Sequence, residues 1–303
     1  MSLITHPNAR ELTKSVRATV LVFKDPRSQE LLSRIERLAP SEANTLIIGE
    51  TGTGKELVAS CLHEFSRRQQ HNYVAINCGG LPEHLFESEI FGHEANAFTG
   101  AGKRRIGKIE HAHKGTLFLD EIESMPINLQ IKLLRVLQER VLERLGSNTL
   151  IPIDCRVVAA TKVDLLELCR QGKFREDLYY RLSVATVDLP PLRERREDVP
   201  LLLEHFVMGA AARHQRPVPD LPAGQLHQLL GYHWPGNVRE LRNVADALVL
   251  GVGPQWVSPH GPAPDATDPD AQPTLTETVE QFERSLIADA LQRHAGNVGQ
   301  TAK

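Results

Sequence analysis

A glycine-rich turn between an apolar segment and a helix is the part of this sequence best suited to chemistry. Residues 45–48 are mainly apolar, residues 49–54 contain three glycines, and Lys55 follows directly. Glycines let backbone amides approach a polyphosphate, the lysine can reach its outer phosphates, and a helix over residues 55–65 would direct its N-terminal amides at the same anion. The pattern predicts a nucleotide-binding P-loop made of Gly49, Glu50, Thr51, Gly52, Thr53, Gly54, Lys55 and Glu56.

Glu56 stands where such loops usually carry Ser or Thr, whose hydroxyl contacts magnesium. The alternative interpretation is a strand-to-helix turn that binds no ligand. Features further along the chain favour the nucleotide, and the first of them is a pair of carboxylates.

Asp120 and Glu121 end an apolar run that begins at residue 115. Transfer of a phosphoryl group to water needs a metal at the phosphates and a positioned water. We therefore predict that Asp120 holds magnesium, directly or through water, and that Glu121 orients and polarises the attacking water. The alternative is an ordinary helix cap.

These residues need a scaffold, and the hydrophobic pattern predicts an α/β one. Apolar segments that read as strands alternate with segments that have helical spacing, which indicates a parallel sheet covered by helices on both faces. The expected strands cover residues 19–24, 45–48, 73–77, 115–121, 156–161 and 183–189, and the expected helices of this part cover residues 26–38, 55–65 and 129–140. After residue 190 only helices are expected, over residues 197–212, 223–230 and 237–250.

Composition limits the other possibilities. The 303 residues are 41% hydrophobic and 24% charged, enough for one large core and a smaller second domain. No apolar run is long enough to span a bilayer, and the first residues lack a signal-peptide pattern, so no membrane association and a cytoplasmic location are expected. A net charge of −3 offers no bulk attraction to nucleic acid. The four cysteines show no CxxC spacing and the histidines no metal-ligand spacing, so buried thiols and no histidine metal site are expected.

The chain divides into five segments that differ in composition and hydrophobic pattern. We predict an N-terminal tail (residues 1–18), an α/β ATPase subdomain (19–190), a helical lid (191–250), a proline-rich linker (251–273) and the start of a further helical domain (274–303). The last helix that begins there has no partner after it, so the sequence is expected to stop inside that domain.

With these motifs in order, the chain resembles the AAA+ ATPase domain of bacterial sigma-54-dependent transcription activators, also called bacterial enhancer-binding proteins. Residues 49–56 resemble the family's Walker A segment, where glutamate at the last position is usual, and residues 115–122 resemble its Walker B segment. Residues 174–182 are similar to its arginine-finger region and residues 234–241 to the second sensor of its lid. The resemblance implies a P-loop AAA+ parallel sheet sandwiched by helices, a small all-α lid, and a partial helical DNA-binding segment.

The resemblance also assigns roles to residues that local pattern alone does not place. It implies that Arg175 and Arg181 act as fingers toward a neighbouring subunit's nucleotide, although a solvated helix face is the alternative for both. It implies that Arg239 contacts the γ-phosphate in the same subunit, or else forms an ion pair. Asn77 resembles the amide that holds the Walker B glutamate inactive, and Thr161 resembles a first-sensor residue, with Lys162 where the family often has Asn.

Residues 91–101 resemble the loop that reads GAFTGA in this family and contacts the sigma factor. The matching positions are Asn96, Ala97, Phe98, Thr99, Gly100 and Ala101. Asn96 replaces the first glycine, and since Asn is the residue that next best tolerates positive φ, we expect the loop geometry to be kept. Phe98 is expected to be an apolar loop tip; the alternative is a core residue.

The resemblance implies an oligomeric ATPase, expected to be a hexameric ring, that uses ATP and Mg to remodel sigma-54 RNA polymerase holoenzyme and so permit promoter opening. Residues 274–303 resemble the start of a Fis-like helix-turn-helix domain without its recognition helix, so binding to enhancer DNA is expected only of an intact C-terminal domain. The alternatives are another AAA+ remodeller of the unfoldase or chelatase type, or a catalytically silent nucleotide-binding DNA adaptor.

Overall fold

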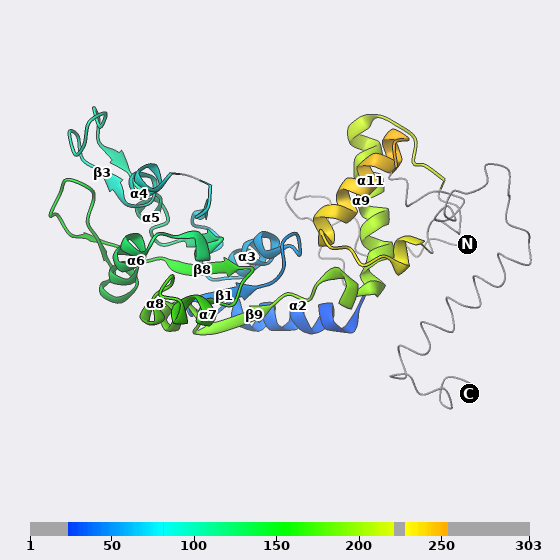
Figure 1. Ribbon diagram of the computed structural model, residues 1–303, viewed down its shortest axis with the longest axis horizontal. Coiled ribbons are helices and arrows are strands. Elements are labelled where there is room, and N and C mark those ends of the chain that lie inside the picture. The colour runs from blue at the N-terminus through cyan, green and yellow to red at the C-terminus, as the bar shows by residue number, and fades with distance from the viewer. Residues whose placement is uncertain (1–23, 81, 221–227, 254–303) are drawn as a thin grey trace, which may run out of the picture. The chain divides into compact units, whose positions relative to one another are not determined.

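The computed structural model describes residues 24–80, 82–220 and 228–253 (Figure 1). Its centre is a parallel five-stranded sheet in the order β2-β5-β8-β1-β9. The strands are β2 (Tyr73–Asn77), β5 (Thr116–Asp120), β8 (Arg156–Thr161), β1 (Thr45–Ile48) and β9 (Ala185–Asp188). The predicted parallel sheet is confirmed, with bounds equal to or slightly shorter than expected. The expected strand over residues 19–24 lies almost wholly outside the described residues.

Successive residues of the inner strands enter different cores because side chains alternate across a sheet. In β5, Leu117 and Leu119 join one buried cluster, whereas Phe118 joins the other. Helices cover both faces, as predicted. One face is covered by α4 (Glu83–Phe91), α5 (Lys108–His111), α6 (Ile127–Glu139), α7 (Leu165–Arg170) and α8 (Glu176–Leu182), the other by α2 (Pro26–Leu38) and α3 (Lys55–Glu64).

Helix α2 is fixed at both ends by polar contacts. Asp25 caps its start by accepting a hydrogen bond from the Arg27 amide at 3.0 Å. At its end, the buried Arg156 of β8 donates to the carbonyls of Leu38 at 3.0 Å and Ala39 at 2.7 Å. These carbonyls would otherwise lack partners, so a cation at the helix C-terminus is favourable.

The lid consists of two short 3-10 turns, η2 (Leu192–Glu194) and η3 (Arg196–Asp198), and the helices α9 (Val199–His214) and α11 (Asn237–Leu250). Figure 1 shows α9 and α11 side by side, and a separate hydrophobic core with the buried Trp234 joins them. Most of the expected helix over residues 223–230 and the segments from residue 254 onward lie outside the described residues. The buried Asp198 accepts from the amides of Lys24 and Asp25 at 2.7 and 2.8 Å, which ties the lid to the start of α2.

A narrow hairpin leaves the sheet domain between α4 and α5. Strand β3 (Gly92–His93) pairs antiparallel with β4 (Arg105–Ile106). At its base the two chains touch backbone to backbone: a Cβ on Gly107 would lie 2.5 Å from the Gly92 nitrogen, and one on Gly92 would lie 2.6 Å from the Gly107 nitrogen. A second short pair, β6 (Val141–Leu142) with β7 (Ile151–Pro152), follows α6. The sequence analysis did not predict these four strands.

Within the described part of the chain, no helix combines the length and the apolar character needed to cross a bilayer.

Candidate functional site

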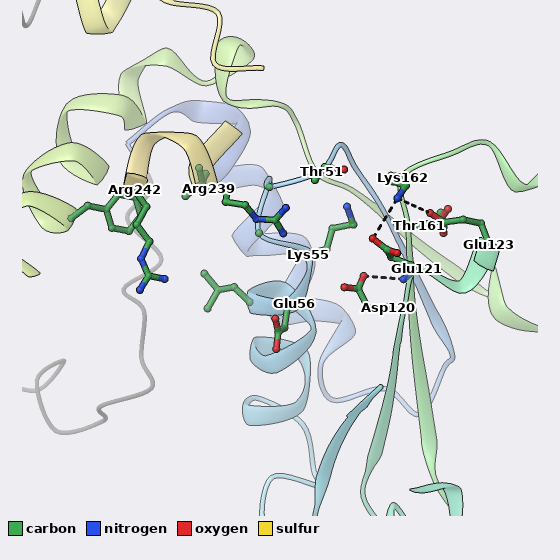
Figure 2. Close-up of a pocket in the computed structure, with 15 residues that line it drawn as sticks. Thr51, Lys55, Glu56, Asp120, Glu121, Glu123, Thr161, Lys162, Arg239 and Arg242 are labelled. Carbon is green, nitrogen blue, oxygen red and sulfur yellow. Dashed lines mark hydrogen bonds and ion pairs between the residues drawn. The ribbon is translucent and has the colours of Figure 1, made fainter. Parts of the chain in front are cut away.

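A pocket of about 310 Å³ opens where the carboxyl ends of β1, β5 and β8 meet the lid (Figure 2). Parallel strands bring their carboxyl ends to one edge, which is where α/β proteins bind ligands. The lining residues come from the P-loop, from the turns after β5 and β8, and from α9 and α11: Thr51, Gly52, Gly54, Lys55, Glu56, Leu57, Asp120, Glu121, Glu123, Thr161, Lys162, Phe206, Val238, Arg239 and Arg242.

The P-loop has the backbone that its glycines predict. Gly52 and Gly54 have φ of +80° and +106°, in the region that favours glycine. Helix α3 starts at Lys55, so its free N-terminal amides face the pocket side of the loop. The Lys55 ammonium donates to the carbonyls of Gly49 at 2.7 Å and Glu50 at 3.0 Å, and burial lowers its pKa despite the nearby Asp120. This arrangement can hold an anion.

The lid covers the outer side of the same loop. Arg239 donates its amide to the Gly52 carbonyl at 3.3 Å, and a Cβ on Gly52 would lie 2.3 Å from the Gly236 carbonyl oxygen. The guanidinium of Arg193 binds Glu50 at 2.8 and 2.6 Å, and Asn237 donates to Glu50 at 3.2 Å. Hydrogen bonds from Arg193 and then Asn237 lower the pKa of Glu50 to about 2.

Three predicted P-loop residues therefore do not face the pocket. Glu50 is turned toward the lid, Thr53 is buried and donates to the Glu50 carbonyl at 2.8 Å, and Gly49 packs against Leu189. They shape the loop and anchor it. Thr51, Gly52, Gly54, Lys55 and Glu56 do line the pocket.

Asp120 and Glu121 enter the pocket from the end of β5, as predicted (Figure 2). The Asp120 carboxylate accepts from the Glu121 amide at 3.0 Å. Glu121 has φ of +51°, a strained value for a non-glycine residue that turns its side chain out of the strand direction. Its carboxylate lies 3.4 Å from the ammonium of Lys162.

Asn77 ends β2 beside this pair. Its side-chain oxygen accepts from the Gly79 amide at 2.8 Å. The Asn77 and Glu121 side chains both border Gly79: a Cβ there would lie 3.5 Å from Asn77 Oδ1 and 2.8 Å from Glu121 Oε2. Thr161 lines the pocket at the end of β8, but its hydroxyl is engaged with Val163 at 3.2 Å.

The sequence analysis missed several residues of the pocket. Glu123 follows Asp120 by three positions, and its side chain is only 8% exposed. Phe206, Val238 and Arg242 reach the pocket from α9 and α11. The second-sensor motif placed Arg239 correctly at the start of the last lid helix, but no local pattern identified its three lid neighbours.

Arg175 and Arg181 do not line this pocket. Arg175 precedes α8 and binds Asp177 with nitrogen–oxygen distances of 3.0 and 2.6 Å. Arg181 lies exposed in the last turn of α8, and its carbonyl accepts from Asn44 at 2.9 Å. Both guanidinium groups are thus on the surface of the domain rather than beside Lys55.

The loop at the end of the β3–β4 hairpin carries the second group of predicted residues. Asn96 has φ of +66°, which confirms that this position needs a residue tolerant of the left-handed region. The Asn96 amide donates to the Ala101 carbonyl at 2.7 Å and closes the turn. Phe98 is 45% exposed and packs edge-on against His93 with ring centroids 5.0 Å apart. The core alternative for Phe98 is therefore wrong.

The loop base is stabilised by contacts with the segment after β6. The buried Arg144 donates from Nη1 to Glu94 at 2.7 Å, and from Nε and Nη2 to Glu110 at 3.0 and 2.6 Å. His93 bridges Ser88 at 2.8 Å and the Lys103 carbonyl at 3.1 Å. These bonds fix where the exposed tip leaves the domain.

Models of three known families match successive parts of this chain. A model of the sigma-54 interaction domain matches residues 21–188. The chain belongs to this sigma-54 interaction family. The AAA+ ATPase lid domain matches residues 193–268, and the Fis family of bacterial regulatory proteins matches residues 278–303, so the lid and the Fis-like resemblance are confirmed.

Family members share much of the sequence. The C4-dicarboxylate transport transcriptional regulatory protein DctD of Pseudomonas aeruginosa is 55% identical over 273 residues, which are 90% of this chain and 58% of that protein. DctD of Rhizobium meliloti is 49% identical over 282 residues, 93% of this chain and 60% of that protein. The chain thus spans about three fifths of the length of these relatives.

Solved structures of related sequence agree with the fold. NtrX from Brucella abortus in complex with ADP has a TM-score of 0.78 and 32% identity over 96% of this chain and 68% of its own. NtrX in complex with ATP has a TM-score of 0.77 and 33% identity over 93% of this chain and 65% of its own. The predicted AAA+ sheet between helices, followed by a helical lid, is confirmed.

The residues present fit a magnesium nucleotide. Asp120 is one of the acidic residues that line the pocket, and its charge lies near Lys55. Magnesium in phosphate sites is commonly held by one or two carboxylates, with phosphate and water supplying the other oxygens. No cluster of three or more His, Cys, Asp or Glu suited to a metal occurs among the described residues. A site completed by phosphate oxygens needs no such cluster.

Proposed function

We propose that this chain is the ATP-hydrolysing part of a transcription activator that remodels sigma-54 RNA polymerase holoenzyme and so drives promoter opening. The observation that carries the proposal is the pairing, within one domain, of the Lys55–Asp120–Glu121 pocket with the exposed Phe98 on its hairpin. Two relatives support it, one named as a sigma-54-dependent transcriptional regulator and the other as a sigma-54-dependent transcriptional activator. The NtrX structures named as complexes with ADP and ATP also support it.

In this proposal the pocket residues divide the work of hydrolysis. Lys55 leaves the carbonyls of Gly49 and Glu50 and binds the outer phosphates, while the α3 amides bind the same anion. Asp120 holds magnesium, which when bound neutralises charge on the phosphate oxygens. Glu121 orients a water for attack and accepts its proton.

The lid and the surface arginines complete the site. Arg239 lines the pocket from the lid side and supplies a cation to the phosphates of its own subunit. Arg175 and Arg181 reach the pocket of a neighbouring copy, because in their own subunit they lie outside it. Their use requires a homo-oligomer, for which a hexameric ring is our proposal, with subdomain limits at 19–190 and 191–250.

A substitution at Phe98 tests the proposed contact with sigma-54. This residue lies outside the nucleotide pocket and is exposed, so Phe98→Ala should leave the ATP site intact. We expect near wild-type hydrolysis, together with at least about a tenfold loss of sigma-54 binding in the presence of ADP–aluminium fluoride and a loss of open complexes, as for a central aromatic interface residue. Phe65→Ala, which truncates another exposed aromatic outside both the loop and the pocket, is the matched control.

Other results would reject the proposal. Wild-type protein that hydrolyses ATP but never binds sigma-54 would indicate an AAA+ remodeller of another type. Nucleotide binding without hydrolysis at any protein concentration would indicate a silent adaptor. Enhancer DNA binding is proposed for the intact C-terminal domain, to which residues 278–303 contribute.

A further inference from the structure

One ammonium group stands between two carboxylates at the edge of the nucleotide pocket. Lys162 Nζ lies 3.4 Å from Glu121 Oε1 and 4.0 Å from Glu123 Oε1, and Figure 2 shows it joined to both. Both glutamates follow β5 and Lys162 follows β8, and these strands are paired neighbours. The arrangement is therefore set by the sheet itself.

The two carboxylates differ in their surroundings. Glu123 has an 8% exposed side chain, and neither of its carboxylate oxygens has a hydrogen-bond partner among the described residues. The Glu121 side chain is 36% exposed and can be solvated. A buried carboxylate without hydrogen bonds is unfavourable, so Glu123 gains more than Glu121 from the approach of a cation.

Lys162 is free to respond to this difference. Its side chain is 40% exposed, and the shorter of its two contacts, to Glu121, is longer than the usual charge-assisted hydrogen bond. Asn77, which the family resemblance gives as the restraint on Glu121, bonds instead to the Gly79 amide. Among the residues that the structure describes, the charged partner of the Glu121 carboxylate is Lys162.

We propose that Lys162 restrains Glu121 and that the buried Glu123 weakens this restraint by competing for the same ammonium group. Lys162 and Glu123 are thus positioning residues that determine how readily Glu121 turns toward the attacking water. This inference rests on the proposed role of Glu121 in hydrolysis.

The competition predicts effects of opposite sign. Glu123→Gln removes the competing charge, so Lys162 stays on Glu121 and turnover should fall about threefold, the size expected for a partly exposed ion pair. Lys162→Met should raise turnover by a similar factor. Because the proposal has Glu123 act on Glu121 through Lys162, the double variant should have the turnover of Lys162→Met alone.

The experiment measures kcat and KM for ATP of the wild-type chain, both single variants and the double variant. KM should stay within about twofold throughout, because neither side chain is assigned to the phosphates. Glu87→Gln, which breaks an exposed ion pair with Lys132 away from the pocket, is the matched control and should leave both constants unchanged. A loss on Glu123→Gln that persists in the Lys162→Met background would mean that Glu123 only supports the fold, and would overturn the inference.

A second measurement needs no hydrolysis. The coupling between Lys162→Met and Glu121→Gln is measured by thermal denaturation of the nucleotide-free protein, first with Glu123 and then together with Glu123→Gln. Competition predicts a larger coupling once Glu123 is neutralised. An unchanged coupling overturns the inference, whereas absence of ATP hydrolysis by the wild-type chain overturns the proposed function and leaves this coupling to decide whether the carboxylates compete.

Discussion

Arg193 and Glu50 are 143 residues apart in the chain, yet the arginine binds both carboxylate oxygens, at 2.8 and 2.6 Å. Arg193 lies in the first 3-10 turn of the lid, and Glu50 lies in the P-loop. Because Asn237 at the start of α11 binds the same carboxylate, one side chain of the P-loop holds two separate parts of the lid.

This contact predicts a pH-dependent contribution to stability. The pKa of Glu50 is lowered from 4.5 to about 2, so its ionised form stabilises the fold above pH 4.5, and the contribution is lost as the pH falls toward 2. Glu50→Gln should lower the melting temperature by about 2 °C near neutral pH. The difference from wild type should shrink on going from about pH 6 to about pH 3.5.

Differential scanning calorimetry of both proteins across this range measures the effect. Glu87→Gln is the control, since it removes a carboxylate that is paired with Lys132 away from the P-loop and the lid. A Glu50→Gln difference that stays constant with pH would contradict the assignment.

The second prediction separates binding from chemistry in the pocket. Lys55→Ala removes a cation from the phosphate site and should weaken ATP binding by at least about tenfold. Glu121→Gln removes only water activation and should bind ATP normally, while turnover falls about 100-fold. Calorimetric titration with ATP and a phosphate-release assay measure the two effects. Equal loss of ATP affinity in both variants would contradict this division of roles.

The third prediction concerns arginines supplied by a neighbouring copy. If Arg175 and Arg181 act between subunits, turnover per subunit should rise with protein concentration, and alanine at either position should reduce it by up to about a thousandfold. Mixing Arg175→Ala with Lys55→Ala should restore part of the activity, because an intact pocket then meets an intact arginine. Arg170→Ala, which removes another exposed arginine, should have no such effect. A rate independent of concentration, without rescue on mixing, would place the arginines in a structural role.

The fourth prediction tests the backbone of the hairpin loop. Asn96 has φ of +66°, so Asn96→Gly should be tolerated, whereas Asn96→Val should cost about 1–2 kcal/mol of loop stability. Hydrogen exchange of the Ala101 amide, which bonds to the Phe98 carbonyl, reports this change. Thr99→Val places the same side chain where φ is not positive and is the control. Equal protection in the two valine variants would show that the backbone at residue 96 carries no strain.

Much of the fold could be predicted because it depends on local sequence patterns. The expected bounds of β2 and β8 were the observed ones, since short runs of mainly apolar residues bounded by turn signals mark strands. The Walker segments predicted Lys55, Asp120 and Glu121 in one pocket, because P-loop spacing fixes the strand-to-helix turn and parallel strands share an edge.

The rest depends on contacts that local pattern does not contain. Two-residue strands such as β3 and β4 are too short to show the alternation of apolar and polar residues that marks a strand, so the hairpin was not predicted. Glu50 was assigned to the nucleotide because it lies within the P-loop motif, whereas its actual partner, Arg193, is 143 residues away and no local pattern joins the two. Glu123 was missed because its burial follows from the packing of the turn after β5, which composition and spacing do not reveal.

The glycine contact at the base of the β3–β4 hairpin has a consequence for how this loop tolerates change in length. Gly92 and Gly107 approach each other backbone to backbone, so the segment between them is a loop whose two ends are held together in the domain. The entropic cost of closing such a loop grows only slowly with the number of residues in it. Changes in length near its tip therefore alter the reach of the loop at little thermodynamic cost to the sheet domain.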